Sequence, residues 1–492
     1  MINYPKLYKN PFTYLLLLTL SVAALSYFDS YGGITMDAPW YLRLAQSIKD
    51  GNGFAVMSPD YIYYNEAQIF FIWPPLYPMF TGYLAVLTHL PVYVSIKIVN
   101  LVFIGITFLL LHKHYRQQAP IFILLFFHAS FFDMVYQGWS EVPFICVLIW
   151  FLLALQKFLT TENSLKWAAV MGLSSLLAIG LRYLGIITLL PFCYLIYKTY
   201  KQKETKKLYS IITIFIICSL AELMFIWFNY FEKNKISGYS WNPSFSEIAD
   251  FGVSFFQQII NSIDFLFSYS LNSWYEKLFS LTVITMIIYR IVKSRLYTKS
   301  EKSDDKTIMI CAFILGISYL LVPLLMRNSY AIGLNNPRFF MVSTIMILFG
   351  ILHYYQIKIS HKFLFQTALI IFAINGVGKS MYMNQYLKLE TFTKRYGRLD
   401  KKYKPIEPNS AVVFADKWLE FMRTDIYVIS PYENVMKDLS PTLGEFEKNI
   451  TKHPGPVYFE IIKNGDNRMF RYKPDITKFH QQNQDKEFVK IK

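Results

Sequence analysis

The sequence predicts an α-helical polytopic membrane protein with a small α/β domain after the last membrane span. Three observations predict this fold class. Hydrophobic residues make up 54% of the 492 residues, the mean hydropathy is +0.30, and long apolar runs recur up to about residue 380. Soluble chains are less apolar than this. Because the remainder is more charged, we expect a transmembrane domain at 1–380 and a second domain at 381–492.

Eleven apolar runs are long enough to cross the ~30 Å hydrocarbon core as helices. They lie at 12–28, 92–111, 119–135, 141–158, 167–182, 184–199, 208–228, 277–292, 307–326, 339–357 and 363–379. Tyr27 and Phe28 stand where a cleaved signal peptide has small residues, so the first run is expected to stay as an anchor. The apolar segment 76–90 is shorter, and we expect it to be a juxtamembrane or re-entrant helix.

Basic residues collect in alternate short loops, which gives the orientation. Clusters follow the second, sixth and eighth runs, at Lys113, Arg116, Lys198, Lys201, Lys203, Lys206, Lys207, Arg290, Lys293, Arg295, Lys299, Lys302 and Lys306. The positive-inside rule places these loops and the N-terminus in the cytoplasm. The 29–91 loop, the 229–275 loop and the C-terminal domain then lie outside, most simply across a bacterial plasma (inner) membrane. Because the net charge of +16 is spread over separate loops, a nucleic-acid partner is a poor explanation of it.

The C-terminal segment has the pattern of a small α/β domain. Apolar stretches at 410–415, 425–430 and 456–462 predict strands, and 417–422 predicts a helix between the first two. Cysteine usage indicates no disulfide framework and no cysteine-based metal site, since all four cysteines fall in predicted spans, at Cys146, Cys193, Cys218 and Cys311. His89, His128 and His353 show no metal-ligand spacing.

Four charged residues stand at the expected outer ends of spans or in the first loop: Asp37, Glu141, Arg182 and Arg338. A charge at the bilayer centre costs at least ~2.5–3.5 kcal/mol, so charges close to spans are expected to serve a purpose. Two acids and two guanidiniums on one face of a bundle suit a site for a sugar and a phosphate.

Each candidate also has a structural interpretation. Asp37, just before Pro39, fits the N-cap of a short helix, and Glu141 could equally cap its span. Arg182 could extend to the membrane interface, as arginines at span ends commonly do. Interfacial positions are the ordinary expectation for Lys97 and Asn100, a solvated face or pairing with an Asp for Arg43, and an aromatic belt for Tyr61, Tyr63 and Tyr64.

The order of several motifs resembles a known class of membrane enzymes. The motifs are Asp37 with Tyr41 and Ala45, then Pro74-Pro75-Leu76, Ser140-Glu141-Val142-Pro143, Gly180-Leu181-Arg182-Tyr183-Leu184-Gly185 and Pro337-Arg338-Phe339. In this order they look like the GT-C class of glycosyltransferases, closest to the group of protein O-mannosyltransferases and bacterial lipid A aminoarabinose transferases. The resemblance covers roughly the first 380 residues.

The resemblance implies a function and a set of site residues. It implies transfer of a sugar, with inversion, from a polyprenyl-phosphate donor to an extracytoplasmic lipid, glycan or protein acceptor. Asp37 and Glu141 would be catalytic, Arg338, Arg182 and Lys97 would bind the donor phosphate, and Tyr41 and Tyr64 would contact substrate. No cofactor is certain, although a divalent metal is possible. This chain has Ala38 where many members have a second acid, and Trp73 where many have Lys or His.

Two other functions stay open. One is a transporter or flippase of lipid-linked sugars, for which broken spans paired between two halves and polar groups at the midplane are typical; the sequence shows neither. The other is a polysaccharide polymerase or ligase, which would share the external site and the lipid donor.

Overall fold

A computed structural model gives the fold of most of the chain. The structure describes residues 4–29, 38–56, 68–69, 73–233, 278, 281–282, 285–286, 289, 293, 297–326, 337–357, 359–385, 391–413, 419–423, 426–429, 455–461, 481–483 and 485–490. Within these ranges six helical segments are long and apolar enough to cross a membrane: Pro11–Phe28, Val92–Phe127, Glu141–Thr160, Ser164–Leu181, Thr205–Trp227 and His361–Tyr382. The prediction of an α-helical integral membrane protein is therefore confirmed. Eleven spans stay a prediction, since 277–292 lies largely outside the described residues.

The chain divides into two compact units. Unit 1 comprises Met1–Gly33, Phe71–Tyr77 and Lys97–Phe392, and unit 2 comprises Ile34–Phe70, Pro78–Ile96 and Thr393–Lys492. These divisions differ from the predicted domains in two ways. Most of the first loop belongs to unit 2, and the predicted boundary at 380 falls inside a helix, α16 (Lys379–Gln385), which continues the last span.

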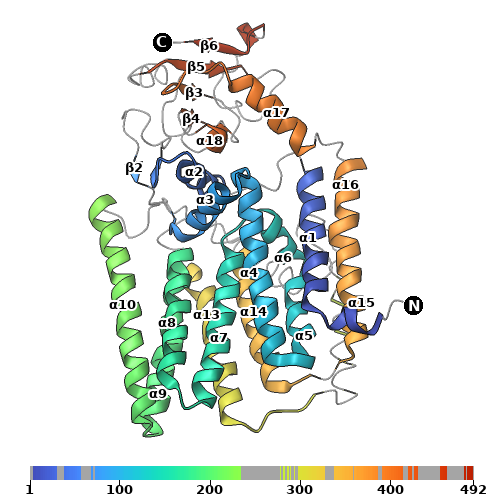
Figure 1. The fold of residues 1–492 in the computed structure, drawn as a ribbon, viewed down its shortest axis with the longest axis vertical. Coiled ribbons are helices and arrows are strands. Elements are labelled where there is room, and N and C mark those ends of the chain that lie inside the picture. The colour runs from blue at the N-terminus through green and yellow to red at the C-terminus, as the bar shows by residue number, and fades with distance from the viewer. Residues whose placement is uncertain are drawn as a thin grey trace. The chain divides into compact units, whose positions relative to one another are not determined.

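Unit 1 is a bundle of helices that run up and down in Figure 1. They are α1 (Pro11–Phe28), α4 (Val92–Tyr115), α7 (Glu141–Thr160), α8 (Ser164–Leu181), α9 (Leu189–Lys201), α10 (Thr205–Lys233), α13 (Ser303–Met326), α14 (Pro337–Tyr355) and α15 (His361–Ile371). Helix α7 contacts α8, α13 and α14 and is buried over nearly its whole length. The bundle core therefore lies around α7, while apolar side chains elsewhere are exposed as in lipid-facing helices, for example Leu220, Leu223 and Trp227 on α10.

One predicted span is broken. Residues 119–135 were expected to form a single helix, but they form α5 (Ala119–Leu124), the 3₁₀ turn η4 (Leu125–Phe127) and α6 (Ala129–Tyr136). The break falls at His128, which is extended and whose side chain accepts a hydrogen bond from the Ser130 amide. The imidazole thus begins a new helix instead of letting the old one continue, and the prediction of one continuous helix is wrong here.

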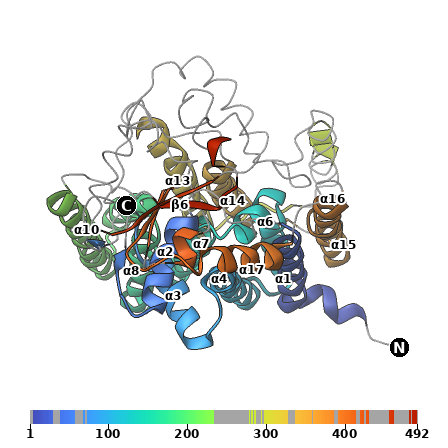
Figure 2. The same ribbon diagram turned by 90° about the horizontal axis from the view of Figure 1, so that it is seen from above.

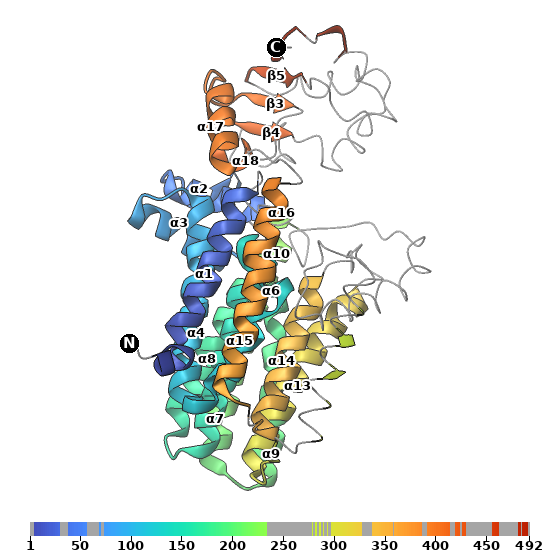
Figure 3. The ribbon, with the colours of Figure 1, turned by 90° about the vertical axis from the view of Figure 1, so that its right-hand side faces the viewer.

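The last span is also irregular. Between α15 and α16 the chain forms a π-helical segment, η8 (Phe372–Gly378), which packs against α1. Figures 2 and 3 show α15 and α16 beside α1. At Gly376 a Cβ atom would lie 2.4 Å from the Ser21 hydroxyl, so the two helices approach too closely for any side chain there. The last span is thus continuous from His361 to Tyr382 but contains this π-helical stretch.

Unit 2 contains a four-stranded sheet in the order β4-β3-β5-β6. Its strands are β3 (Ala411–Val413), β4 (Tyr427–Ile429), β5 (Val457–Glu460) and β6 (Phe488–Lys490). Strand β3 is parallel to β4 and β5, and β6 is antiparallel to β5. The first three strands fall within the stretches where the sequence predicts them. Helix α17 (Phe392–Tyr403) runs beside the sheet in Figure 3, and Tyr403 at its end donates a hydrogen bond to Glu460 of β5.

Residues of the first loop form the rest of unit 2. Helix α2 (Ala38–Lys49) is followed by the short antiparallel pair β1 (Ala55–Val56) and β2 (Gln68–Ile69). Helix α3 (Leu76–Thr88) is the short apolar helix expected there, and most of it belongs to unit 2. At Gly82 of α3 a Cβ would lie 2.9 Å from the Ala45 carbonyl oxygen, so α2 and α3 are closely packed.

Candidate functional site

Two of the predicted site residues form a buried ion pair in unit 1. Arg182 Nη1 lies 2.7 Å from Glu141 Oε1, and the two side chains are 8% and 1% exposed. The same Nη1 donates to Ser140 Oγ at 3.0 Å. Glu141 begins α7 and Arg182 directly follows α8. We call this end of the bundle, the upper end in Figure 1, the Glu141 end. The interpretations of Glu141 as a simple cap and of Arg182 as an interfacial arginine are replaced by this pair.

Local sequence explains how these two side chains are placed. Gly138 has a φ of +70°, which lets the chain turn sharply between α6 and α7. Arg182 has extended backbone angles that end α8, and the chain then re-enters the bundle through the 3₁₀ segment η5 (Tyr183–Thr188). At Gly185 a Cβ would lie 2.3 Å from the Ile179 backbone nitrogen, so only glycine fits at that return. The two glycines thus fix where Glu141 and Arg182 meet.

The Pro-Pro motif packs against the same return segment. At Gly180 a Cβ would lie 3.0 Å from Leu76 Cδ2. The Trp73 and Tyr183 rings lie 6.3 Å apart between centroids, tilted by 45°. Motifs that are about a hundred residues apart in the sequence are therefore in direct contact within unit 1. Trp73 fills space beside Tyr183, which is a packing role for a position where the resembling family has Lys or His.

A second polar cluster of unit 1 includes Lys97. Lys97 Nζ donates to Ser26 Oγ at 2.7 Å, and Asp29, which caps the end of α1, accepts from the Tyr136 hydroxyl at 3.5 Å. Next to Lys97 on α4, Asn100 accepts from the Tyr77 hydroxyl at 2.9 Å. Lys97 is 8% exposed and Asn100 is fully buried. The expectation that both are interfacial is wrong, because each has a specific partner inside the bundle.

An ion pair that the sequence analysis missed belongs to the same region. Lys379 Nζ lies 2.5 Å from Asp133 Oδ1, with both side chains largely buried, and the ammonium also lies 5.4 Å from the centre of the Tyr136 ring. A signal for Asp133 existed, since a carboxylate inside an apolar run is costly unless it is paired. Its partner is 246 positions away in the sequence, and no local pattern connects them.

A further buried acid was missed in α10. Glu222 is 4% exposed, and one of its carboxylate oxygens makes no hydrogen bond within the described part of the chain. Phe225, one turn further along α10, packs on Tyr183 with ring centroids 5.5 Å apart. Glu222 therefore lies on the helix that covers the return segment after Arg182, and it too stood inside a predicted span.

The remaining predicted site residues are less fully described. Asp37 and Tyr64 lie outside the described residues. Arg338 is the second residue of α14, but its side chain lies outside what is described. Tyr41 and Arg43 of α2 are each 1% exposed. The substrate role of Tyr41 stays a prediction. Of the two positions expected for Arg43, the solvated one is wrong, because α2 is buried on nearly all sides within its own unit, and pairing with an Asp stays a prediction.

A metal centre has no ligand set among the described residues. No group of three or more His, Cys, Asp or Glu side chains in that part of the chain could hold an ion. Glu141 and Asp133 are each engaged with a cation of the protein. Dependence on a divalent metal stays a prediction.

Comparison with solved structures relates the chain to membrane glycosyltransferases. The oligosaccharyltransferase of Archaeoglobus fulgidus, in complex with Zn and sulfate, matches with a TM-score of 0.47 and 12% identity over 91% of this chain and 68% of that one. ArnT of Cupriavidus metallidurans, bound to undecaprenyl phosphate, matches with a TM-score of 0.43 and 12% identity over 90% of this chain and 92% of that one. No protein-family model and no curated protein matches the sequence.

Proposed function

We propose that this chain is a membrane glycosyltransferase that transfers a sugar, with inversion, from a polyprenyl-phosphate donor to an extracytoplasmic acceptor. The observation that carries the proposal is the buried Glu141–Arg182 ion pair at 2.7 Å. Two of the motifs that resemble the GT-C class supply its members, and a third packs on the segment after Arg182. Burying two charges at the end of a span costs several kcal/mol per ion before pairing, so a polar substrate at that end is a reason to keep them.

Within this proposal Arg182 positions Glu141 and is not the main phosphate ligand. Its Nη1 is engaged by both Glu141 and Ser140. A guanidinium binds phosphate best when its fork of N–H groups can face the phosphate oxygens. Paired with Glu141, it instead holds that carboxylate in one orientation.

Lys97 and Arg338 are the proposed ligands of the donor phosphate. Lys97 Nζ donates to the Ser26 hydroxyl and interacts electrostatically with Asp29, so it forms part of a buried polar cluster at the start of α4. Arg338 stands in the first turn of α14, which begins at Pro337, and helix N-termini favour anions. Both groups would stabilise the polyprenyl phosphate as it departs with the bonding electron pair.

Asp37 is the proposed general base. It immediately precedes α2, whose first residues are Ala38 and Pro39. An ionised Asp37 would take the proton of an acceptor hydroxyl while that oxygen bonds to the anomeric carbon and the carbon–phosphate oxygen bond breaks. Inversion follows because the attack and the departure occur on opposite faces of the sugar. General-base assistance of this kind is typically worth about 10²–10⁴-fold in rate. If Asp37 is only a cap, Glu141 is the leading acid.

The proposal is tested by donor turnover in membranes that contain the overproduced protein. A labelled polyprenyl-phosphate sugar is supplied, and released polyprenyl phosphate and glycosylated product are both measured. Lys97→Met should lower donor binding and turnover together by about 10-fold or more, because a charge-assisted hydrogen bond contributes roughly 1.5–3 kcal/mol. Lys113→Met is the matched control, since Lys113 is exposed near the other end of the same helix. Unchanged binding and turnover in an inserted Lys97→Met protein would remove Lys97 from the donor site.

One observation favours the alternative of a transporter of lipid-linked sugars. One apolar run is broken at His128 and another contains the π-helical segment η8, and broken spans are typical of transporters when they are paired between two halves. Proteoliposomes separate the two functions. A transferase forms a glycosidic product and releases polyprenyl phosphate, whereas a transporter moves the labelled lipid across the bilayer and leaves it chemically unchanged.

A further inference from the structure

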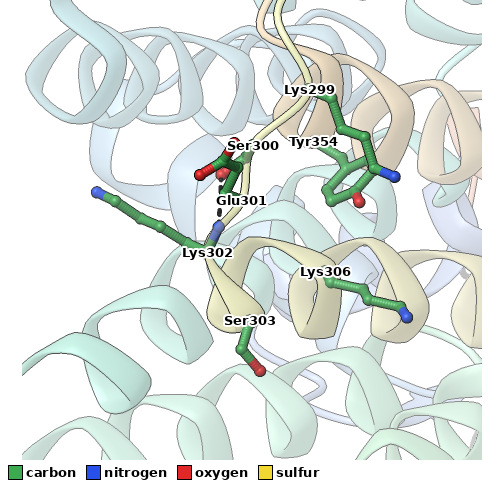
Figure 4. A pocket seen from close by; sticks show the side chains of 7 residues that line it. All are labelled: Lys299, Ser300, Glu301, Lys302, Ser303, Lys306 and Tyr354. Atoms are coloured by element: carbon green, nitrogen blue, oxygen red, sulfur yellow. Dashed lines mark hydrogen bonds between the residues drawn. The ribbon is translucent and has the colours of Figure 1, made fainter.

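A cavity of about 370 Å³ lies at the start of α13, at the end of unit 1 opposite to the Glu141 end. Figure 4 shows its lining, which consists of Lys299, Ser300, Glu301, Lys302, Ser303, Lys306 and Tyr354. The ammonium groups of Lys299 and Lys306 lie on the same side as the Tyr354 hydroxyl, and Lys302 extends to the other side. No residue proposed for sugar transfer takes part in this cavity.

Backbone hydrogen bonds and buried side chains fix the walls of the cavity. The Thr298 and Ser300 amides donate to the carbonyls of Tyr355 and Tyr354, each at 3.0 Å. This attaches the segment that carries Lys299 to the end of α14. The Lys299 ammonium lies 5.8 Å from the centre of the Tyr354 ring. The position of Lys299 beside Tyr354 is therefore determined by the fold.

A buried chain of hydrogen bonds lies behind the wall. The Ser300 hydroxyl bonds Asp305 Oδ2 at 2.5 Å, and His353 Nε2 lies 3.2 Å from Asp305 Oδ1. The Tyr115 hydroxyl lies 2.9 Å from His353 Nδ1. If that hydroxyl donates to Nδ1, then Nε2 carries the ring proton and donates it to Asp305, which satisfies every member of the chain. Asp305 is thus hydrogen-bonded inside the protein; among the cavity lysines it interacts electrostatically with Lys302, which leaves Lys299 and Lys306 for a ligand.

The cavity keeps an excess of positive charge. Its lining has three lysines and one carboxylate, that of Glu301. Asp304, in the first turn of α13, lies 3.5 Å from Lys198. Among the described residues no ion pair involves Lys299, Lys302 or Lys306. Two uncompensated positive charges beside a hydroxyl are suited to a phosphate group.

An apolar face of α13 runs from the cavity along the bundle. Counting from Lys306, the residues at steps of 4, 7, 11 and 15 are Ile310, Phe313, Ile317 and Leu321, which lie on one side of a helix. Ile317 and Leu321 are each 47% exposed, and Ile310 and Phe313 are partly exposed. Such a face is suited to an acyl chain whose head group lies at Lys306, and a soluble phosphate would make no use of it.

We propose that this cavity is a binding site for an anionic phospholipid. The lipid phosphate lies against the ammonium groups of Lys299 and Lys306 and the Tyr354 hydroxyl, and an acyl chain follows the exposed face of α13. Basic loops on the cytoplasmic side attract anionic lipids in general. The cavity and the apolar face of α13 distinguish the loop before α13 from the other basic loops. The site is independent of the function proposed above.

The test compares lipid binding by the full-length protein in nanodiscs or detergent, measured by native mass spectrometry. The probes are phosphatidylglycerol, phosphatidylcholine and inorganic phosphate. Lys299→Ala/Lys306→Ala is the test variant. Lys113→Ala/Lys362→Ala is the control, because it removes the same charge from exposed lysines at the same end, outside the cavity. We expect the control to bind phosphatidylglycerol as the wild type does and the test variant to bind about 30-fold more weakly, roughly 2 kcal/mol at about 1 kcal/mol per lysine.

Three results would overturn the proposal. The first is equal binding of phosphatidylglycerol and phosphatidylcholine by the wild type. The second is an equal loss in both variants, since surface charge alone would then account for binding. The third is displacement of the lipid by millimolar inorganic phosphate, which would make the site one for a soluble anion. If the double variant does not fold, Lys306→Gln and Lys113→Gln form the same comparison with one charge each.

Discussion

Removing either partner of the Glu141–Arg182 pair should destabilise the protein strongly, and removing both together should cost much less. Arg182→Met leaves the Glu141 carboxylate buried without its cation, and Glu141→Gln leaves a buried guanidinium without its anion. The two side chains are 8% and 1% exposed, so water replaces neither partner. The double variant Glu141→Gln/Arg182→Met leaves no buried charge at this position.

The separation of the atoms gives the magnitude. At an effective dielectric constant of about 20, two unit charges 2.7 Å apart attract each other by about 6 kcal/mol. Much of this attraction offsets the desolvation of both ions, so the net cost of removing one partner is about 3–5 kcal/mol. The double variant should recover most of that loss, so the coupling free energy should be at least about 3 kcal/mol, the cost of one single variant, which is the upper end of the range found for residues in contact.

The assay is equilibrium unfolding in mixed micelles, with the free energy of unfolding extrapolated to zero denaturing detergent. Lys207→Met is a matched control, because Lys207 pairs with Glu204 at 3.2 Å on the surface and exposed pairs contribute only about 0–1 kcal/mol. Single variants at Glu141 and Arg182 that unfold like the wild type would refute the reasoning. A double variant as unstable as the sum of the two single variants would refute it as well.

Three further predictions concern the same bundle. Gly185→Ala should lower the free energy of unfolding by about 1–3 kcal/mol or more, because its Cβ would lie 2.3 Å from a backbone nitrogen of α8. The control Gly397→Ala, on an open face of α17, should leave the free energy of unfolding unchanged. Equal effects of the two substitutions would contradict the packing argument. Lys379→Met should cost about 3–5 kcal/mol by leaving Asp133 buried and unpaired, measured by the same unfolding assay, and a neutral result would mean that the pair does not form. Glu222→Met should raise the free energy of unfolding by about 1–3 kcal/mol. The substitution removes a buried carboxylate oxygen that makes no hydrogen bond within the described part of the chain. A lower free energy of unfolding in this variant would mean that Glu222 has a partner.

Much of the membrane fold could be predicted because one physical property dominates it. Apolar length alone locates the helices, and α1, α7, α8 and α14 begin or end within about three residues of the predicted runs. Breaks in helices are set by single side chains. At His128 the imidazole accepts from the amide two residues on, and nothing in an apolar run distinguishes such a histidine from one that points elsewhere.

The candidate site could be predicted in part. Charges at span ends identified Glu141, Arg182 and Lys97, but their partners could not be assigned, because each contact joins two different helices and no local pattern connects them. Asp133 could have been predicted as a paired residue, because a carboxylate inside an apolar run is costly unless it is paired. The lysine cavity could not be predicted at all, since its lysines also satisfy the positive-inside rule, and only the folded chain places Tyr354 and the exposed face of α13 beside them.

The most direct test of the central claim is sugar transfer by the wild type and by Asp37→Asn in the same membranes, with donor binding measured in parallel. The isosteric amide has nearly the same size and shape as the carboxylate and removes the base. We predict that the wild type releases polyprenyl phosphate and forms an inverted glycosidic product. Asp37→Asn should bind donor normally and transfer about 10²–10⁴-fold more slowly. Near-full transfer by Asp37→Asn, or passage of unchanged labelled lipid across the bilayer with no product from the wild type, would contradict the account.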